Sequence, residues 1–581
     1  MLHPVDYAII ALYVLMILGV GLYFSRKAAG SIDQYFLGER HIPWYILGLS
    51  GMATFVDMSG TQMQVSFYYM FGVKGYWFCY RAALALILSF LMIFMGKWLN
   101  RARVMTNAGL IGLRFGAGRQ GATAKLLTAG SILLVGFFGA AYFFVGGGRF
   151  LSSYLPLSPQ ACGILYFSAV FIYLSMSGFY GVVYTDIFQA VLIFGMIIFI
   201  SVKAMALGTP EYFAQHAPEG WSDLIPSSWT LDAPAGYENM QSLGLLLLFW
   251  IMLNVFQGFA MPWSSAEPQR FYAAKNERES SLVAFQWITL TSLKYLLMMG
   301  LGILSIGIAA QVASPEGALT AVINHYLPVG GIKGLFIAAL LAAAMSILDS
   351  IINSSAAYFV KDIYQEHLRP KAGRRHLIVV SYLATAGILL GGILLGWDVS
   401  RINDINIWIC MGLITGMLPP NILKWIWWRF NGLGYALGMA AGLLSSLAVM
   451  RLGLLDGSPE YLIFITVTVC SAAGAIAGTF LGKAPDTEVL VDFYRKIRPF
   501  GFWGPVKQHC DREFVRAIAK ENRRDLLLLG PARLWQMSLF AMMTAIVAKK
   551  WDLLLSTAII VGALSVILYR FWYRNLGRTT A

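Results

Sequence analysis

Long apolar runs separated by short polar segments dominate this chain and predict a series of membrane-crossing helices. The first run covers residues 7–24 and the last covers residues 553–571. Because a helix needs about 20 mainly apolar residues to cross a bilayer, the pattern predicts an all-α polytopic membrane protein with about 13–15 transmembrane helices. The first run lacks a basic start and a small-residue cleavage site, so we expect a retained helix rather than a signal peptide.

One apolar run, residues 43–72, is interrupted at its centre by polar residues. Asp57 lies there between Gly51 and Gly60. A charge at bilayer depth costs at least ~2.5–3.5 kcal/mol unless it is paired, and glycines make a local break in a helix inexpensive. An unwound membrane helix exposes carbonyl groups that can hold a cation. We therefore expect Asp57 to mark an ion or solute site. The alternative is a kinked helix in which Asp57 is neutral or paired with a neighbour.

A second interrupted helix begins near residue 243. Interrupted helices at corresponding positions in two halves of a transporter indicate a binding site near the membrane midplane. The breaks and the loop charges predict two five-helix repeats of opposite topology, at about residues 43–207 and 243–427, with one extra helix before them. The residues that interrupt the second helix are Asn254, Gln257, Gly258 and Pro262.

The distribution of charge argues for a membrane orientation and against nucleic acid as a partner. The chain carries a formal net charge of +14, yet only 12% of its residues are charged, and the basic residues gather in alternate loops. This is the positive-inside pattern. It predicts a multi-pass protein of the cytoplasmic membrane with its N-terminus outside and its C-terminus inside.

The pattern also divides the chain into a transmembrane core and a tail. We expect the core at residues 1–482, a cytoplasmic amphipathic segment at residues 483–533 and a C-terminal hairpin and tail at residues 534–581. Within the middle segment, Asp511 is expected to cap a surface helix and Gly530 to end it. The two last apolar runs are either two spans or one shallow hairpin, since the first is short for a full span.

Four polar residues share one face of the predicted ninth helix. Ser346, Asp349, Ser350 and Asn353 recur at spacings of three or four. Carboxylate and hydroxyl oxygens suit a small hard cation such as sodium. The alternative is packing between helices through small residues.

Asp186 is expected to begin a helix after a tight turn at residues 178–185. It is either a second ion-site carboxylate or an acid favoured by the helix dipole.

Other polar or aromatic residues are candidates to bind a small polar solute by hydrogen bonds, with surface or packing roles as the alternative. Arg81 either faces an anionic solute or lies at the interface. The candidates are Gln62, Arg81, Asn254, Gln257, Trp263 and Asn406.

No pattern typical of an enzyme or of an ATP-driven pump is present, because the chain has no Walker loop, HExxH pattern or kinase signature. The five cysteines have no metal-ligand spacing. We therefore expect no catalytic residue and no cofactor, and an ion gradient as the energy source.

Several short motifs occur in order along the chain. Among them are Thr185-Asp-Ile-Phe-Gln189 and the Gln269-Arg270 pair. Others lie at residues 21–27, 35–38, 114–116, 346–354, 362–364 and 494–503. Singly these motifs are weak, but in this order and at the expected depth they resemble the sodium:solute symporter family over residues 6–482.

The resemblance implies the leucine-transporter-like fold, with sodium-coupled uptake by alternating access. It implies a common sodium site made by the carbonyls of Phe55 and Met58 with Ser346, and an aspartate, here Asp57, that matters for sodium. It also implies a further sodium site at Asp186, Ser346, Asp349 and Ser350. The chain departs from the family at Ile347, where members often have a second hydroxyl.

These observations predict a sodium-coupled symporter of a small polar organic solute, for which a monomer suffices. One alternative keeps the fold but couples to protons, motivated by Ile347 and three candidate carboxylates. The other is a transporter-like sensor that signals through its tail, although no soluble output domain is evident.

Overall fold

The computed structural model describes residues 2–28, 40, 42–53, 56, 58–81, 84–226, 228–232, 237, 240–261, 266–399, 402–454 and 458–577. Within these ranges all regular elements are helices, apart from one isolated bridge between Trp427 and Phe502. Twelve helices are long and apolar enough to cross a membrane, and two shorter apolar helices accompany them. The predicted all-α polytopic architecture is therefore confirmed.

The first half of the core begins with α1 and contains the interrupted helix that the sequence predicts. Helix α3 ends at Ala53 and α4 begins at Met58, so the run is divided at its polar centre. The helices here are α1 (Pro4–Ala28), α3 (Trp44–Ala53), α4 (Met58–Phe71), η2 (Gly72–Lys74), α5 (Gly75–Phe78), α6 (Leu84–Phe90), η3 (Leu91–Met95), α7 (Gly96–Ala102), α8 (Asn107–Phe115), α9 (Arg119–Ser152), α10 (Pro159–Leu207) and α11 (Pro210–His216).

The second half is also interrupted as expected. Helix α12 ends at Ala260 and α13 begins at Ala266. The last helical stretch of this half, residues 402–426, contains a π-helical segment, η8, ahead of Pro419 and Pro420. The helices are α12 (Leu243–Ala260), α13 (Ala266–Ala273), α14 (Glu277–Ser292), α15 (Lys294–Ile306), η5 (Ala309–Gln311), η6 (Pro315–Gly317), α16 (Ala318–Tyr326), α17 (Ile332–Ala357), η7 (Tyr358–Leu368), α18 (Arg374–Gly396), α19 (Ile402–Ile407), η8 (Trp408–Ile414) and α20 (Thr415–Ile426).

Two sequence expectations about helix boundaries are wrong. The backbone stays helical through residues 178–185, where a tight turn was expected, so that α10 contains both flanking spans. Asp511 does cap α25, since its Oδ1 accepts from the backbone N–H groups of Glu513 and Phe514 at 2.7 and 3.2 Å. The helix nevertheless continues through Gly530 and Pro531 to Val547, because packing of its apolar second half outweighs the local cost of these residues.

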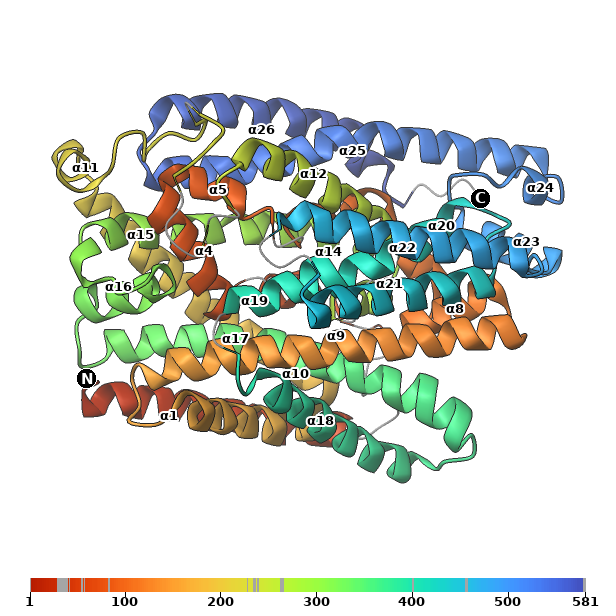
Figure 1. Cartoon of the computed structure of the whole chain (residues 1–581), viewed down its shortest axis with the longest axis horizontal. Coiled ribbons are helices and arrows are strands. Elements are labelled where there is room, and N and C mark those ends of the chain that lie inside the picture. The colour runs from red at the N-terminus through yellow and green to blue at the C-terminus, as the bar shows by residue number, and fades with distance from the viewer. Residues whose placement is uncertain are drawn as a thin grey trace.

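The C-terminal helices form a long hairpin along one side of the core (Figure 1). Lys550, in the turn between α25 and α26, lies 3.6 Å from Asp223 in the loop after α11. Away from this turn, Lys97 is bonded to Asp525 of α25, and Trp572 after α26 donates to the carbonyl of Met92 at 3.2 Å. Both helices are long enough to span. The elements are α21 (Gly432–Leu452), α22 (Glu460–Leu481), α23 (Thr487–Ile497), α24 (Gly504–Lys507), α25 (Arg512–Val547), α26 (Trp551–Phe571) and η9 (Tyr573–Asn575).

The helices run along the long axis of the molecule, with connecting elements at both ends (Figure 1). Helices α11 and α16, predicted to lie outside, are at one end with the N-terminus. Helices α8, α23 and α24, predicted to lie inside, are at the opposite end. The predicted inner and outer segments are thus separated in space.

Small residues let the interrupted helix α3 pack closely on α14. A Cβ added to Gly51 would lie 2.7 Å from Cδ2 of Trp287, and one added to Gly48 would lie 2.5 Å from Oε1 of Gln286. Close approach through glycine is a common way for membrane helices to associate. It holds α3, and therefore Ser50, in a fixed position beside the second interrupted region.

Candidate functional site

Asp186 lies at the centre of a buried polar cluster where α3, α10, α13 and α17 meet. Its carboxylate is fully buried. It accepts hydrogen bonds from the hydroxyls of Ser50 on α3 and Ser346 on α17, one on each oxygen. The sequence predicted Asp186 and Ser346 as ion-site residues, and the fold brings them into direct contact.

Arg270 on α13 supplies the positive charge of this cluster. Its Nη2 lies 3.4 Å from Oδ2 of Asp186 and donates to Oγ of Ser350 at 3.2 Å and to Oγ of Ser50 at 2.9 Å. Its guanidinium also lies 5.8 Å from the ring centroid of Trp287. One arginine therefore joins the residues after the second helix break to both α3 and α17.

Asp349 is the second carboxylate of the cluster. It accepts a hydrogen bond from the hydroxyl of Tyr173 on α10, and its Oδ1 accepts from Oγ of Ser350 at 3.3 Å. Ser346, Asp349, Ser350 and Asn353 are all buried. The face predicted from their spacing in α17 therefore points into the protein, toward α10 and α13.

In the described part of the chain, this cluster contains more acids than bases. Two carboxylates, Asp186 and Asp349, face one guanidinium, so the cluster carries one net negative charge when both acids are ionised. Isolated charge is expensive in a buried membrane site. A single monovalent cation would balance this charge, and the hydroxyls of the three serines would offer hard oxygen ligands to it.

The other predicted ion-site residues lie at the break between α3 and α4. Phe55 and Asp57 are outside the described residues. Met58 is buried at the start of α4. Two hydroxyls just after it, those of Ser59 and Thr61, are buried and have no hydrogen-bond partner within the described part of the chain. Buried polar atoms of this kind indicate room for a ligand or water.

The solute candidates occupy two different surroundings. Gln62 on α4 is buried, and its Nε2 has no partner among the described residues. Asn254 on α12 donates to the carbonyls of Tyr80 and Trp250 at 2.9 and 2.8 Å. Gln257 is buried in the same helix, Asn406 is partly exposed in α19, and Trp263 is outside the described residues.

Arg81 has a carboxylate partner that the sequence did not indicate. Its Nε donates to Oε2 of Glu460 on α22 at 3.0 Å, and its Nη2 is bonded to Oε1. Both side chains are buried. Arg81 is therefore not an isolated charge, because Glu460 offsets it in a two-pronged contact.

Sequence reasoning missed three members of the central cluster: Ser50, Tyr173 and Arg270. Arg270 had a usable signal, since an arginine just after a broken membrane helix needs a buried acid. Ser50 and Tyr173 gave none. Neutral hydroxyls are common in apolar runs, and only the fold brings these two residues to Asp186 and Asp349.

The membrane-spanning helices, the two interrupted helices and the buried carboxylate cluster beside them define an ion-coupled secondary transporter. The chain belongs to the sodium:solute symporter family, whose sequence profile matches residues 35–442. It is accordingly a sodium-coupled symporter and not an enzyme, and sodium is its coupling ion.

Individual relatives agree with this placement. The chain is 27% identical over 486 residues to a sodium/glucose cotransporter of Vibrio parahaemolyticus, covering 76% of this chain and 84% of the relative. It is 24% identical over 453 residues to a sodium/pantothenate symporter of Haemophilus influenzae, covering 76% and 90%.

The fold itself matches a solved structure. A Na⁺-coupled sialic acid symporter in a substrate-bound, outward-open state superposes with a TM-score of 0.64 at 20% identity, covering 83% of this chain and 98% of that one. The predicted leucine-transporter-like fold is confirmed by this similarity.

Proposed function

We propose that the Asp186–Asp349 cluster binds the coupling sodium, and that a small polar organic solute binds beside it between α4, α12 and α19. The supporting observation is the unequal number of charges: two buried carboxylates share one arginine. A bound Na⁺ restores neutrality, and the oxygens of Ser346, Asp349 and Ser350 are its ligands together with Asp186. The carbonyls of Phe55 and Met58, with Ser346, form the common sodium site next to it, near Asp57.

The solute is recognised by hydrogen bonds rather than by a free arginine. Glu460 already offsets Arg81, whereas Gln62 and Asn254 each present a buried amide atom without a partner among the described residues. Such atoms favour a solute with several hydroxyl or amide groups. Gln257, Trp263 and Asn406 complete the proposed solute site.

Transport takes place across the cytoplasmic membrane, with the N-terminus outside. Residues 1–482 form the transport core, in which residues 43–207 and 243–427 are the two repeats, and a monomer suffices. Sodium binding favours the state open to the outside and completes the solute site, so that ion and solute bind cooperatively.

The test follows thermal stability of the purified protein in nanodiscs during a sodium titration, with potassium and choline at equal ionic strength. A ligand of the folded state stabilises it by RT ln(1 + [L]/Kd), about 2.7 kcal/mol at 100 times Kd. We expect a sodium-specific rise that deepens with one member of a panel of neutral polyols, amides and carboxylates.

Two variants locate the site. Asp349→Asn should abolish the sodium response, whereas Asp223→Asn, an exposed aspartate in the loop after α11, should leave it unchanged. A sodium response that survives in Asp349→Asn would contradict the proposed location, and equal responses to sodium and choline would contradict sodium binding itself.

A further inference from the structure

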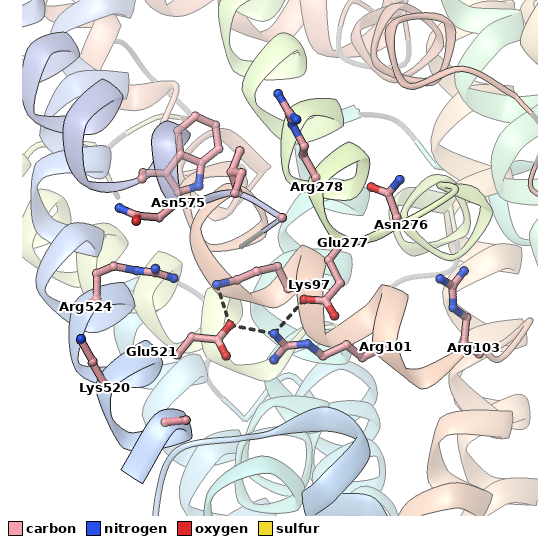
Figure 2. A pocket seen from close by; sticks show the side chains of 14 residues that line it. Lys97, Arg101, Arg103, Asn276, Glu277, Arg278, Lys520, Glu521, Arg524 and Asn575 are labelled. Carbon is pink, nitrogen blue, oxygen red and sulfur yellow. Dashed lines mark hydrogen bonds and ion pairs between the residues drawn. The ribbon is translucent and has the colours of Figure 1, made fainter. Parts of the chain in front are cut away.

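A basic pocket lies where α7, α14, α25 and the residues after α26 meet (Figure 2). We call it the α25 pocket. Its volume is about 780 Å³. It lies beside the end of α23, because Arg101 donates to the carbonyl of Ile497 at 3.1 Å. Its cationic side chains are Lys97, Arg101, Arg103, Arg278, Lys520 and Arg524.

Carboxylates offset only part of this positive charge. Glu521 accepts from Lys97 at 3.2 Å and from Arg101 at 2.7 Å, and Arg101 also pairs with Glu277 at 2.7 Å (Figure 2). Asp525, behind the pocket wall, is bonded to Lys97 and lies 3.0 Å from Arg524. Six cations thus face three acids, and the pocket is positive overall.

Three of the cations have no carboxylate within 4.0 Å in the described part of the chain. Arg103 donates to the carbonyl of Lys275 at 3.2 Å, and Arg278 lies over the ring of Tyr573 at 5.9 Å. Lys520 is exposed on α25. In Figure 2 these side chains come from opposite sides of the pocket, with Lys520 on one wall and Arg103 and Arg278 on the other. Their placement suits an anion with several oxygens.

An apolar groove continues directly from the pocket. Lys520 and Arg524 line both cavities, and from them the groove runs between α25 and α26 along Leu527, Ile567 and Phe571. Leu527 is 67% exposed and Phe571 is 49% exposed. A charged pocket therefore passes into an uncovered hydrocarbon surface within one or two helical turns.

The junction between pocket and groove coincides with the expected level of the membrane surface. In α25, charged residues are frequent up to Asp525 and give way to the leucines that follow. At the matching end of α26, Trp572 and Tyr573 lie beside Arg570 and Arg574. Aromatic and basic residues gather in this way at the boundary between lipid and water. The pocket thus lies among headgroups and the groove among acyl chains.

We propose that the α25 pocket binds the headgroup of an anionic phospholipid whose acyl chains lie in the groove between α25 and α26. Basic pockets between transmembrane helices suit phosphodiester headgroups. A free phosphate shares the headgroup's chemistry, but it would leave the groove uncovered. The bound lipid ties α25 and the end of α26 to α7 and to the start of α14, and so joins the C-terminal hairpin to the transport core.

The test uses delipidated full-length protein in detergent and measures both thermal stability and lipid retention by native mass spectrometry. Phosphatidylglycerol is compared with phosphatidylcholine of identical acyl chains, and a third arm uses inorganic phosphate and glycerol phosphate at equal ionic strength. Only phosphatidylglycerol should stabilise the protein and remain bound, with affinity that falls as salt rises.

A double variant then lowers the positive charge of the pocket and breaks one ion pair, that between Arg524 and Asp525. In Lys520→Gln/Arg524→Gln, Asp525 keeps Lys97 as its partner, and we expect phosphatidylglycerol affinity to fall at least fivefold. The matched control is Arg374→Gln/Arg375→Gln, which removes two exposed charges at the start of α18. Leu527→Gln changes the groove and leaves the charge of the pocket intact, and it should also weaken phosphatidylglycerol binding. An unchanged sodium response verifies that each variant is folded.

Three results would overturn the proposal. Equal retention of the two lipids would exclude recognition of the headgroup. Stabilisation by inorganic phosphate equal to that by phosphatidylglycerol would make the pocket a site for soluble anions. Equal losses of phosphatidylglycerol affinity in the pocket variant and the control variant would mean that the lipid responds to the net charge of the protein and not to this pocket.

Discussion

Two buried arginines in this transporter have opposite surroundings. Arg81 meets one carboxylate, that of Glu460, through two nitrogens. Arg270 contacts Asp186, Ser50 and Ser350, and a second carboxylate, Asp349, lies next to Ser350. The first arrangement is an ion pair between the segment after α5 and the start of α22. The second arrangement contains two acids and one base among the described residues.

The difference indicates where a cation can enter. A neutral, two-pronged pair offers an additional ion no net attraction, and its removal would leave a buried charge. A site with two acids and one arginine attracts a monovalent cation while the protein keeps its fold. The ratio of buried acids to buried bases, rather than the presence of an acid alone, thus separates a structural ion pair from a candidate sodium site.

The largest effect is expected when the neutral pair is broken. Glu460→Gln leaves Arg81 buried without its counter-charge, which should lower the stability of the folded protein by about 3–5 kcal/mol. Thermal unfolding in nanodiscs would measure the loss. The double variant Arg81→Leu/Glu460→Leu should recover most of it, because no buried charge remains. If Glu460→Gln is as stable as the unmodified protein, the Arg81–Glu460 pair does not stabilise the fold.

The next effect concerns the unbalanced cluster. In Asp349→Asn one carboxylate and one arginine remain, so the charge that attracts sodium is gone. The stabilisation by saturating sodium, about 2.7 kcal/mol at 100 times Kd, should disappear. Stability without sodium should change little, since Tyr173 can still donate to the amide carbonyl that the substitution introduces. Sodium titrations of the two proteins under identical conditions provide the measurement.

Replacing Arg270, the base of the cluster, should raise sodium affinity, whereas Asp349→Asn should lower it. In Arg270→Gln the cluster retains both acids, and its attraction for cations increases. We expect sodium to bind roughly tenfold more tightly, a change of about 1.4 kcal/mol, while stability without sodium falls. Isothermal titration of folded protein would measure the Kd. Weaker sodium binding would mean that Arg270 positions Ser50 and Ser350 as ligands instead of opposing the ion.

The sequence was informative wherever a charge had to be explained at bilayer depth. Spacing alone placed Ser346, Asp349 and Ser350 on one buried face, and Asp186 lies against that face as the resemblance implied. The two helix breaks also lie where the polar residues and Pro262 predicted them. These features depend on local chemistry, which a sequence displays directly.

Pairings between distant residues were beyond prediction. Glu460 follows Arg81 by 379 residues, and Ser50 precedes Asp186 by 136. Nothing in either segment specifies the partner, since the contact exists only after several helices have packed. The continuation of α25 through Gly530 and Pro531 has the same origin, because tertiary packing there outweighs local helix propensity.

The smallest expected effect concerns Ile347, the neighbour of Ser346 on α17. This position is partly buried, and its side chain packs against the hydrophobic core. Ile347→Thr keeps a β-branched side chain and adds one hydroxyl next to Ser346, restoring the pair of oxygens that relatives often have. If the common sodium site uses this oxygen, affinity should rise by about 1 kcal/mol, the typical value of one polar contact.

The matched control is Ile347→Val, which changes the volume without adding an oxygen. Sodium titrations monitored by thermal stability would compare the three proteins. Tighter sodium binding in the threonine variant alone would place a sodium site at the break between α3 and α4, in addition to the Asp186–Asp349 cluster. Equal affinities would mean that the cluster, with its two acids and one arginine, accounts for sodium binding without the second hydroxyl.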